Sequence, residues 1–220
     1  MAEEALSDAI QDYLKEIYKL RTDSGKATTT ALAKRLHVSP ASVSAMVKKL
    51  AALGLAEHVP YRGVDLTPAG EKVALEVVRH HRLLELYLAE TLGIAVESVH
   101  AEADRLEHAL SEALEARIDE ALSSPTQDPH GDPIPDARLR IVRPEARPLT
   151  ALEPGEQATV ERVPDGDDDV LRYLSMLALV PGQNVELLRA ASFGGPVTIR
   201  TIGGEAAISR ELGAQIHVSS

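Results

Sequence analysis

A helix with a clear start, one apolar face and a clear end constrains the fold of this chain more than any other segment. In the stretch VSPASVSAMVKKLAALGL, Ser39 is a preferred N-cap residue and Pro40 suits the first helical position. Apolar residues then recur every three to four positions, and Gly54 ends the pattern. Just upstream, residues 28–37 predict another short helix, with its cap in a run of threonines. The sequence therefore predicts two consecutive helices joined by a tight turn.

A short β ribbon is expected after these helices. Residues 55–59 and 64–66 are β-prone and flank a turn that contains Tyr61 and Gly63. Helix, turn, helix and ribbon is the order of elements in a winged helix-turn-helix, whose second helix enters the major groove of duplex DNA. Small side chains at the start of that helix allow close approach to base edges, and basic side chains neutralise phosphates. The candidate DNA-contacting residues are Ser39, Pro40, Ala41, Ser42, Ser44, Lys48, Lys49 and, in the ribbon turn, Arg62.

The charge distribution along the chain agrees with an N-terminal DNA-binding part. The 220 residues carry a formal net charge of −11, but residues 1–72 hold 10 Lys and Arg against 9 Asp and Glu. Within 26–64 there are six basic residues and one acid, Glu57. Because salt screens charges beyond about 8–10 Å, such a local basic face can act on nearby DNA. A solvated helix face is the alternative interpretation of these charges.

The middle of the chain predicts helices, and its end predicts a small β domain. One helix is expected from Pro68 to Gly93, a second over about 96–122, and a Pro-rich linker over 123–150. The last seventy residues hold five short β-prone runs and one helical piece, which predicts an SH3-like barrel. The predicted fold class is thus mainly α with small β. Its expected parts are a winged helix-turn-helix domain (1–72), a helical metal-binding and dimerisation domain (73–142), a linker (143–150) and an SH3-like domain (151–220).

Composition excludes several kinds of site and location. The chain has no cysteine, which excludes disulfides, thiolate zinc sites, iron–sulfur clusters and cysteine nucleophiles. No apolar run approaches the roughly 18 residues that span a bilayer. The acidic, amphipathic N-terminus lacks the basic start and apolar block of a signal peptide. These features predict a cytoplasmic protein without a membrane partner.

Carboxylate and imidazole side chains recur at helical spacing in the two predicted central helices. Residues at positions i, i+3 and i+4 share one helical face and can converge on one point. The residues with this spacing or one turn from it are Asp104, Glu107, His108, His100, His81 and Glu85. In the absence of sulfur donors, this set suits Mn²⁺ or Fe²⁺. Surface charges that pair across exposed helix faces are the alternative interpretation.

On these and other segments the sequence resembles the family of the diphtheria toxin repressor and the manganese transport regulator. The resemblance covers essentially the whole chain. Its segments are DYLKEIYKL from Asp12, residues 38–55 with the ribbon turn, HHRLLE from His80, VHAEADRLEH from Val99, and the motifs LVPG and GGPV. The C-terminal part resembles the family's SH3-like domain, which is also seen as a ferrous-transport accessory module. The resemblance implies a homodimeric repressor that requires a divalent metal to bind a palindromic operator in double-stranded DNA.

The resemblance also implies a regulatory metal site. Its ligands would be Asp12, Asp104, Glu107 and His108, with His81 as a further or bridging ligand. Iron-sensing members carry sulfur where Asp12 and Asp104 stand, so the carboxylates favour Mn²⁺ over Fe²⁺, although other divalent metals can bind in vitro. Shorter manganese-sensing members carry a carboxylate where Lys15 stands, which argues against a dinuclear site of their kind.

A second, ancillary site is implied by the three-domain members. It would use His81, Glu85, His100 and an acid of the SH3-like domain, for which Asp167, or its neighbours Asp168 and Asp169, is the candidate. Other members draw a ligand from the linker, where Asp128 and His130 have the appearance of that element. A solvated acidic loop is the alternative interpretation of residues 167–169.

Two functions of other classes are open from the residues alone. A metalloenzyme could use the same carboxylate–histidine site, but no general base, nucleophile or phosphate-binding glycine loop is evident, so no enzymatic activity is expected. A winged-helix regulator that responds to an organic effector would bind DNA equally well after removal of the metal.

Overall fold

The computed structural model of the protein describes residues 6–59 and 63–219. Among these residues no helix is long and apolar enough to cross a membrane. The chain divides into two compact units, each with its own set of segments. The first unit contains the residues up to His81, Leu106–Ser111 and Pro135–Arg140. The second unit contains Arg82–Arg105, Glu112–Ile134 and the chain from Ile141 onwards.

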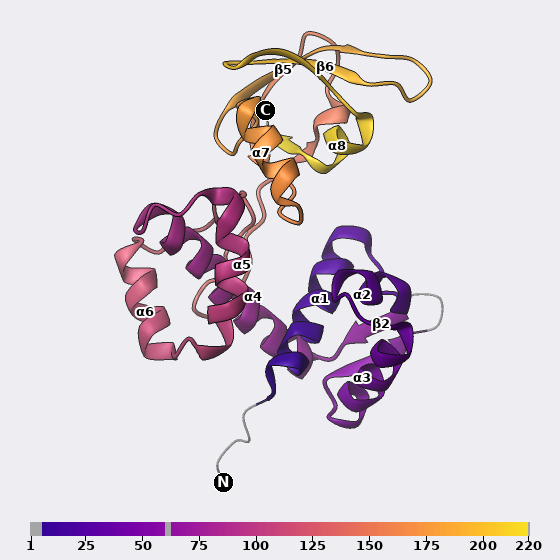
Figure 1. The fold of residues 1–220 in the computed structure, drawn as a ribbon, viewed down its shortest axis with the longest axis vertical. Helices are drawn as coiled ribbons and strands as arrows, with labels where there is room; N and C mark the ends of the chain where they lie inside the picture. The colour runs from indigo at the N-terminus through magenta and orange to yellow at the C-terminus, as the bar shows by residue number, and fades with distance from the viewer. Residues whose placement is uncertain (1–5, 60–62, 220) are drawn as a thin grey trace. The chain divides into compact units, whose positions relative to one another are not determined.

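The first unit contains the predicted helix-turn-helix. Its helices α1 (Asp8–Ser24), α2 (Thr29–Arg35) and α3 (Pro40–Ala52) share one apolar core (Figure 1). Ser39 caps α3, because its Oγ accepts a hydrogen bond of 3.1 Å from the backbone N–H of Ser42. The predicted start of this helix, with proline at its first position, is therefore confirmed.

Helix α1 ends at a glycine. The helix continues through Thr22 and Asp23 to Ser24. The hydroxyl of Ser24 donates a hydrogen bond of 2.8 Å to the carbonyl of Leu20, which supports the last turn. Gly25 then adopts a left-handed φ of 71°, a conformation that glycine accepts without strain, and this residue ends the helix.

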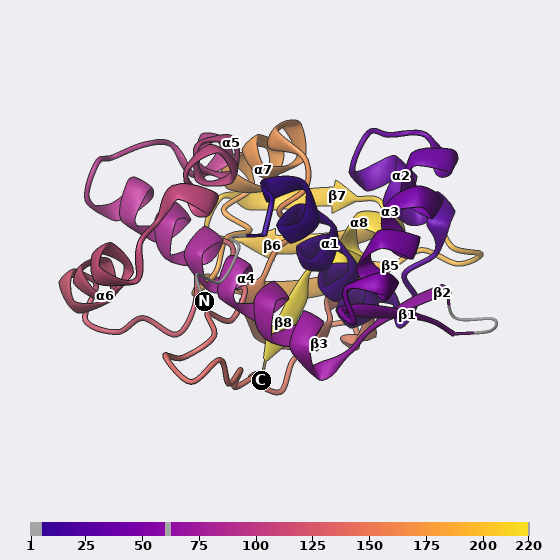
Figure 2. The same ribbon diagram turned by 90° about the horizontal axis from the view of Figure 1, so that it is seen from below.

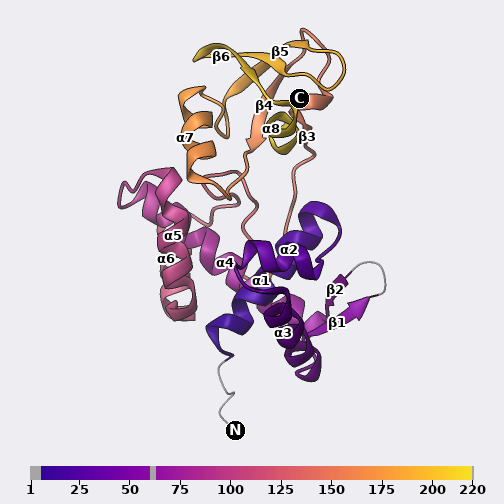
Figure 3. The same ribbon diagram turned by 45° about the vertical axis from the view of Figure 1, so that its right-hand side comes forward.

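The predicted ribbon follows α3 as an antiparallel hairpin of β1 (Ala56–Val59) and β2 (Gly63–Leu66). Figure 3 shows the hairpin beside α3 in the first unit. The base of the hairpin is anchored, because Ala56 and Leu66 are paired and both side chains are buried in the core. Arg62, predicted to contact DNA, lies outside the described residues.

The central helices differ from the prediction in one important respect. Helix α4 (Pro68–Glu90) begins at the expected proline, but the single helix expected over 96–122 is wrong. The chain instead forms α5 (Val96–Leu106), a 3₁₀ turn (Glu107–Ala109) and α6 (Glu112–Ala121). Leu110 is extended (φ −71°, ψ 118°), which ends the 3₁₀ turn. The sequence signal that was missed is a serine directly before α6, with two acidic residues in the first turn of that helix. This combination favours the start of a new helix.

The C-terminal part forms the predicted small barrel. Its sheet has the strand order β3-β8-β4-β5-β6-β7 with antiparallel neighbours, and Figure 2 shows β6 and β7 side by side. The strands are β3 (Arg147–Pro148), β4 (Gln157–Arg162), β5 (Asn184–Ala190), β6 (Val197–Thr201), β7 (Gly204–Ile208) and β8 (His217–Ser219). The helices are α7 (Asp168–Met176), which was predicted, and α8 (Arg210–Gln215), which was not. With six residues, α8 is too short to give a clear helical period.

The segment predicted as a linker is partly buried. Within 123–150, His130 and Ile134 are almost fully excluded from solvent. The backbone N–H of Val163 donates a hydrogen bond of 2.9 Å to the carbonyl of His130, so the segment packs against the end of β4. The segment, which was expected to be a linker with one ordered turn, is held here by burial and by a backbone contact that its proline content does not reveal.

Candidate metal centres and nucleic-acid surface

The first cluster of the first unit is built around Glu107. Its carboxylate is buried, and each oxygen has a close partner. Oε1 lies 2.6 Å from Nζ of Lys15 on α1, and Oε2 lies 2.6 Å from Nδ1 of His81 on α4. Burial opposes the ionised form, but the His81 and Lys15 partners outweigh burial and lower the pKa of Glu107. The structure therefore places an ionised carboxylate inside the protein.

Asp12 and His108 complete this cluster. Nε2 of His108 lies 2.9 Å from Oδ1 of Asp12 and 3.4 Å from Oε1 of Glu107. The other ring nitrogen, Nδ1, lies 2.9 Å from Oε1 of Gln11 on α1. Burial raises the pKa of Asp12, and the nearby His108 and Lys15 oppose this rise.

The donor set of this first cluster fits a divalent cation. Asp12, Glu107 and His108 each offer a ligand atom, and these atoms lie within 4.8 Å of one another. Two carboxylates and an imidazole are donors that suit Mn²⁺ or Fe²⁺. The family resemblance implied these three residues together with Asp104. Glu107 and His108 were expected on an α-helix, whereas the structure places them on a 3₁₀ turn.

The second cluster lies in the second unit and is almost fully buried. Glu85 of α4 and the pair Asp128 and His130 offer ligand atoms within 4.8 Å of one another. His130 is fully excluded from solvent, and within the described part of the chain neither ring nitrogen has a hydrogen-bond partner. Its Nδ1 is 3.8 Å from Oε2 of Glu85, which is too long for a hydrogen bond. A buried imidazole with two unsatisfied nitrogens fits a metal ligand.

Protonation in the second cluster is strongly perturbed. Burial, followed by the charges of Glu85 and Asp132, raises the pKa of Asp128 to about 7. Burial lowers the pKa of His130, but the carboxylates of Glu85, Asp128 and Asp165 outweigh burial and raise it to about 9. The metal-free cluster therefore holds protons near neutral pH that a cation would displace.

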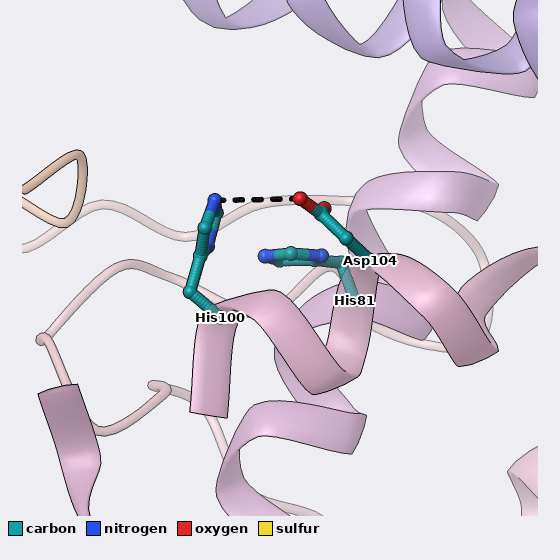
Figure 4. A group of neighbouring side chains, drawn as sticks. All are labelled: His81, His100 and Asp104. Carbon is teal, nitrogen blue, oxygen red and sulfur yellow. Dashed lines mark ion pairs between the residues drawn. The ribbon is translucent and has the colours of Figure 1, made fainter. Parts of the chain in front are cut away.

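His100 and Asp104 lie one turn apart on α5, and Figure 4 shows their side chains directed toward each other. Nε2 of His100 is 3.7 Å from Oδ2 of Asp104, and its Nδ1 is 2.9 Å from Oε1 of Glu85. His100 therefore adjoins the second cluster through Glu85. Helix α5, which carries Asp104, ends at Leu106, so Asp104 and Glu107 do not belong to one continuous α-helix as the sequence predicted.

Two acids of the SH3-like part, the predicted Asp167 and its neighbour Asp165, have different surroundings. Asp167 is the exposed N-cap of α7, and its Oδ1 accepts hydrogen bonds from the N–H groups of Asp169 and Val170. The acid whose charge acts on His130 is Asp165. The sequence signal for Asp165 is its position in a Pro-Asp-Gly turn, which holds a side chain in a defined place.

An ion network that the sequence did not reveal supports the second cluster. Arg82 is buried on α4, and its guanidinium lies 3.1 Å from Oδ1 of Asp132 and 3.5 Å from Oδ2 of Asp128. Arg82 also donates a hydrogen bond of 2.6 Å to the carbonyl of Pro133. From β4, Arg162 reaches the same Oδ1 of Asp132 at 3.2 Å. The network thus joins α4, the 128–133 loop and the β domain within the second unit.

The exposed side of α3 carries the predicted DNA-contacting residues. All the candidates between Ser39 and Lys49 are exposed, whereas Val43 and Leu50 of the same helix are buried. The hydroxyl of Ser44 donates a hydrogen bond of 2.9 Å to the carbonyl of Pro40. Arg35 of α2 pairs with Glu16 at 3.2 Å and with Asp23 at 3.4 Å, so it is engaged within the unit.

Three family models match consecutive parts of the chain. Residues 5–64 match the iron dependent repressor N-terminal DNA binding domain, and residues 67–136 match the iron dependent repressor metal binding and dimerisation domain. Residues 147–220 match the FeoA domain. The order of these domains agrees with the order of elements in the structure.

Relatives and solved structures are similar over almost the full length. The iron-dependent repressor IdeR of Mycobacterium tuberculosis (strain ATCC 25618 / H37Rv) is 35% identical over 213 residues, which cover 91% of each chain. A manganese-dependent transcriptional repressor solved in complex with manganese is 38% identical, with a TM-score of 0.90, and the match covers 96% of this chain and 99% of that one. The manganese regulator SloR is 30% identical with a TM-score of 0.82, covering 96% and 98%.

Proposed function

The chain belongs to the diphtheria toxin repressor and manganese transport regulator family, and from this premise we propose how its own residues make DNA binding depend on a cation. It is a manganese- or iron-dependent DNA-binding transcriptional repressor, it forms a homodimer, and it is not an enzyme. The finer features proposed are a cytoplasmic location, a palindromic operator, Mn²⁺ as the cation in the cell, and two metal sites per chain. The observation that carries this proposal is the buried carboxylate of Glu107, with the ligand atoms of Asp12 and His108 within 4.8 Å.

The choice of Mn²⁺ is supported by the ligand chemistry. The first cluster offers carboxylate and imidazole donors, and the chain contains no cysteine. Hard oxygen donors suit Mn²⁺, whereas sulfur donors would favour softer metals. Geometry and metal availability, rather than raw affinity, then select the metal, because other first-row ions bind such donors as tightly or more tightly.

The first cluster is proposed as the regulatory site. Asp12 and Lys15 lie on α1, a helix that packs in the same core as the DNA-reading helix α3. A bound divalent cation supplies two positive charges that draw carboxylates and neutral imidazoles together. Residues of α1 and of the 3₁₀ turn are thereby fixed to one another, and this favours the DNA-binding arrangement by differential affinity. Asp104 remains a predicted additional ligand.

The second cluster is proposed as an ancillary site. Glu85, Asp128 and His130 are its proposed ligands, with His100 beside Glu85. From the β domain, Asp165 is favoured over the predicted Asp167, because Asp165 acts electrostatically on His130 whereas Asp167 is occupied as a helix cap. Because its ligands come from α4 and the 128–133 loop, a cation here would hold that loop in place.

The exposed face of α3 is proposed to contact DNA. Ser42 and Ala41 near its N-terminus are small enough for close approach to base edges, and Lys48 and Lys49 are positioned on the exposed side for phosphates. A two-fold symmetric dimer binds half-sites about 34–36 Å apart, or a multiple of that distance, so the operator is expected to be palindromic.

The proposal is tested by selecting DNA fragments from a random pool with Mn²⁺ and, in parallel, with a chelator. Enrichment of a two-fold symmetric site only in the presence of Mn²⁺ is the expected result, and it also identifies the operator. Equal enrichment in both arms would contradict the metal dependence. Enrichment of a non-symmetric site would contradict the palindromic operator.

A further inference from the structure

Lys15 is a buried cation in the middle of the first cluster. Its exposed fraction is 6%, and lysine is rarely buried to this extent unless it is paired. The partner is Glu107, whose Oε1 lies 2.6 Å from Nζ of Lys15, although the two residues are 92 positions apart in the sequence. Such a contact is part of the folded arrangement of the cluster rather than a consequence of local helix geometry.

The contact between Lys15 and Glu107 affects Glu107, the proposed metal ligand on which the proposed function depends. Oε2 of Glu107 already faces Nδ1 of His81 at 2.6 Å, and Oε1 faces both Lys15 and, at 3.4 Å, Nε2 of His108. A divalent cation at Oε1 must therefore share this oxygen with an ammonium group or displace it. Because the repulsion between two cations grows with the product of their charges, sharing is unfavourable in a buried place.

Lys15 also lies beside a proposed ligand on the same helix. It lies three residues after Asp12 on α1, so the two side chains project from the same helical face toward the cluster. An ammonium group offers three donors and no lone pair, so it cannot coordinate a metal while it is charged. A carboxylate at this position would instead add a third acidic ligand to Asp12 and Glu107.

We propose that Lys15 acts as an internal cation that competes with the metal for Glu107, and that it thereby weakens the first site and limits it to one ion. This inference rests on the proposed function, in which Glu107 is a metal ligand. A purely structural role is the competing explanation, in which Lys15 only compensates the buried charge of Glu107. The two explanations predict different changes in metal affinity when Lys15 is replaced. Loss of a competitor tightens metal binding, whereas loss of a structural support does not.

The test is Mn²⁺ binding to the full chain, measured by the electron paramagnetic resonance signal of free Mn²⁺. His130→Ala is introduced into every sample so that the second cluster does not contribute. In this background, K15Q is expected to tighten the remaining site by about tenfold or more, and K15E is expected to bind one additional ion. K15R keeps the charge and should keep the weak affinity, and K72Q removes an exposed positive charge of α4 as a matched control.

Each result decides the question. An unchanged or weaker affinity of K15Q, together with an unchanged number of ions in K15E, would overturn the role of Lys15. Absence of Mn²⁺ binding in every variant, including K15Q, would instead overturn the assignment of the first site. If K15Q does not fold, the comparison of K15E with K15R still tests the role of Lys15. If these two variants bind Mn²⁺ with the same affinity and bind the same number of ions, the inference is contradicted.

Discussion

Asp128 and His130 show how burial prepares a residue for a metal. Both side chains are buried beside Glu85, and the pKa of each is raised, to about 7 for Asp128 and about 9 for His130. For Asp128 the main cause is burial, and for His130 the surrounding carboxylates outweigh burial. A metal binds only the deprotonated forms of these groups, so protons compete with it near neutral pH.

The affinity of the second site for Mn²⁺ should therefore rise with pH. Between pH 7 and pH 8, His130 must release about one proton and Asp128 part of another, so the affinity should increase roughly tenfold. Calorimetric titration in buffers of different ionisation enthalpy measures both the affinity and the protons released. An affinity that does not change with pH, without proton release, would show that Asp128 and His130 are not ligands.

Lys49 tests the proposed phosphate contacts of α3. Its side chain is exposed on the helix, so Lys49→Ala should not disturb the core. If its ammonium group neutralises one phosphate, the variant should weaken binding to all DNA sequences similarly and lower the salt slope of log K by about one. Fluorescence anisotropy over a range of salt concentrations gives the slope, with Lys72→Ala as a control. A loss limited to the operator sequence would show that Lys49 contacts bases instead.

At the scale of elements, the 128–133 loop connects the second cluster to the β domain. Val163 donates a backbone hydrogen bond to His130, and Arg162 pairs with Asp132. Gly131 lies between these contacts with φ +87°, and a Cβ at this position would be 1.8 Å from the carbonyl oxygen of Glu161. The close approach of the loop to β4 therefore requires glycine.

Gly131→Ala and Gly155→Ala form a matched pair that measures this close approach. Gly155 has φ +88° but open space around its Cβ position, so both variants share the backbone strain and only Gly131→Ala adds the clash. Gly131→Ala should be less stable than Gly155→Ala by at least about 2 kcal/mol. In thermal unfolding, this corresponds to a Tm about 4–8 °C lower. Equal Tm values for the two variants would show that the loop does not pack on β4 in solution.

Elements with local signals could be predicted from the sequence, and elements that depend on distant contacts could not. Helix α3 follows from the cap at Ser39 and the proline after it, both of which act within one turn. The interruption at Glu107 was missed because the apolar stripe of 96–122 continues across it. What stabilises the interruption is the burial of Glu107 against Lys15 and His81, and neither residue is near it in the sequence.

The candidate metal sites also depend on contacts between residues that are far apart in the sequence. The grouping of Asp12 with Glu107 and His108 came from the family resemblance, because no periodicity relates α1 to residues about one hundred positions later. The supporting roles of Arg82 and Asp132 were not predicted, although Arg82 lies within the segment HHRLLE. Their roles depend on burial and on hydrogen-bond geometry, which exist only in the folded chain.

At the scale of the whole molecule, net charge and metal binding both affect the affinity for DNA. Residues 1–72 carry a net charge of +1 and the rest of the chain carries −12, which repels DNA. Binding therefore depends on the local surface of α3 and on correct alignment of the two copies in a dimer. A cation that prefers the aligned state raises the DNA affinity, and by thermodynamic linkage DNA raises the metal affinity by the same factor.

The most direct test of this account is the operator affinity with Mn²⁺ and with a chelator, measured by fluorescence anisotropy for the wild type and Glu107→Gln. Glutamine keeps the shape of the buried side chain but removes the charge, and Glu112→Gln, on the exposed start of α6, is the control. In the wild type and the control, Mn²⁺ should raise the affinity by about 5–150-fold. In Glu107→Gln this gain should disappear. The same Mn²⁺-dependent gain in Glu107→Gln as in the wild type would contradict the central role of this site.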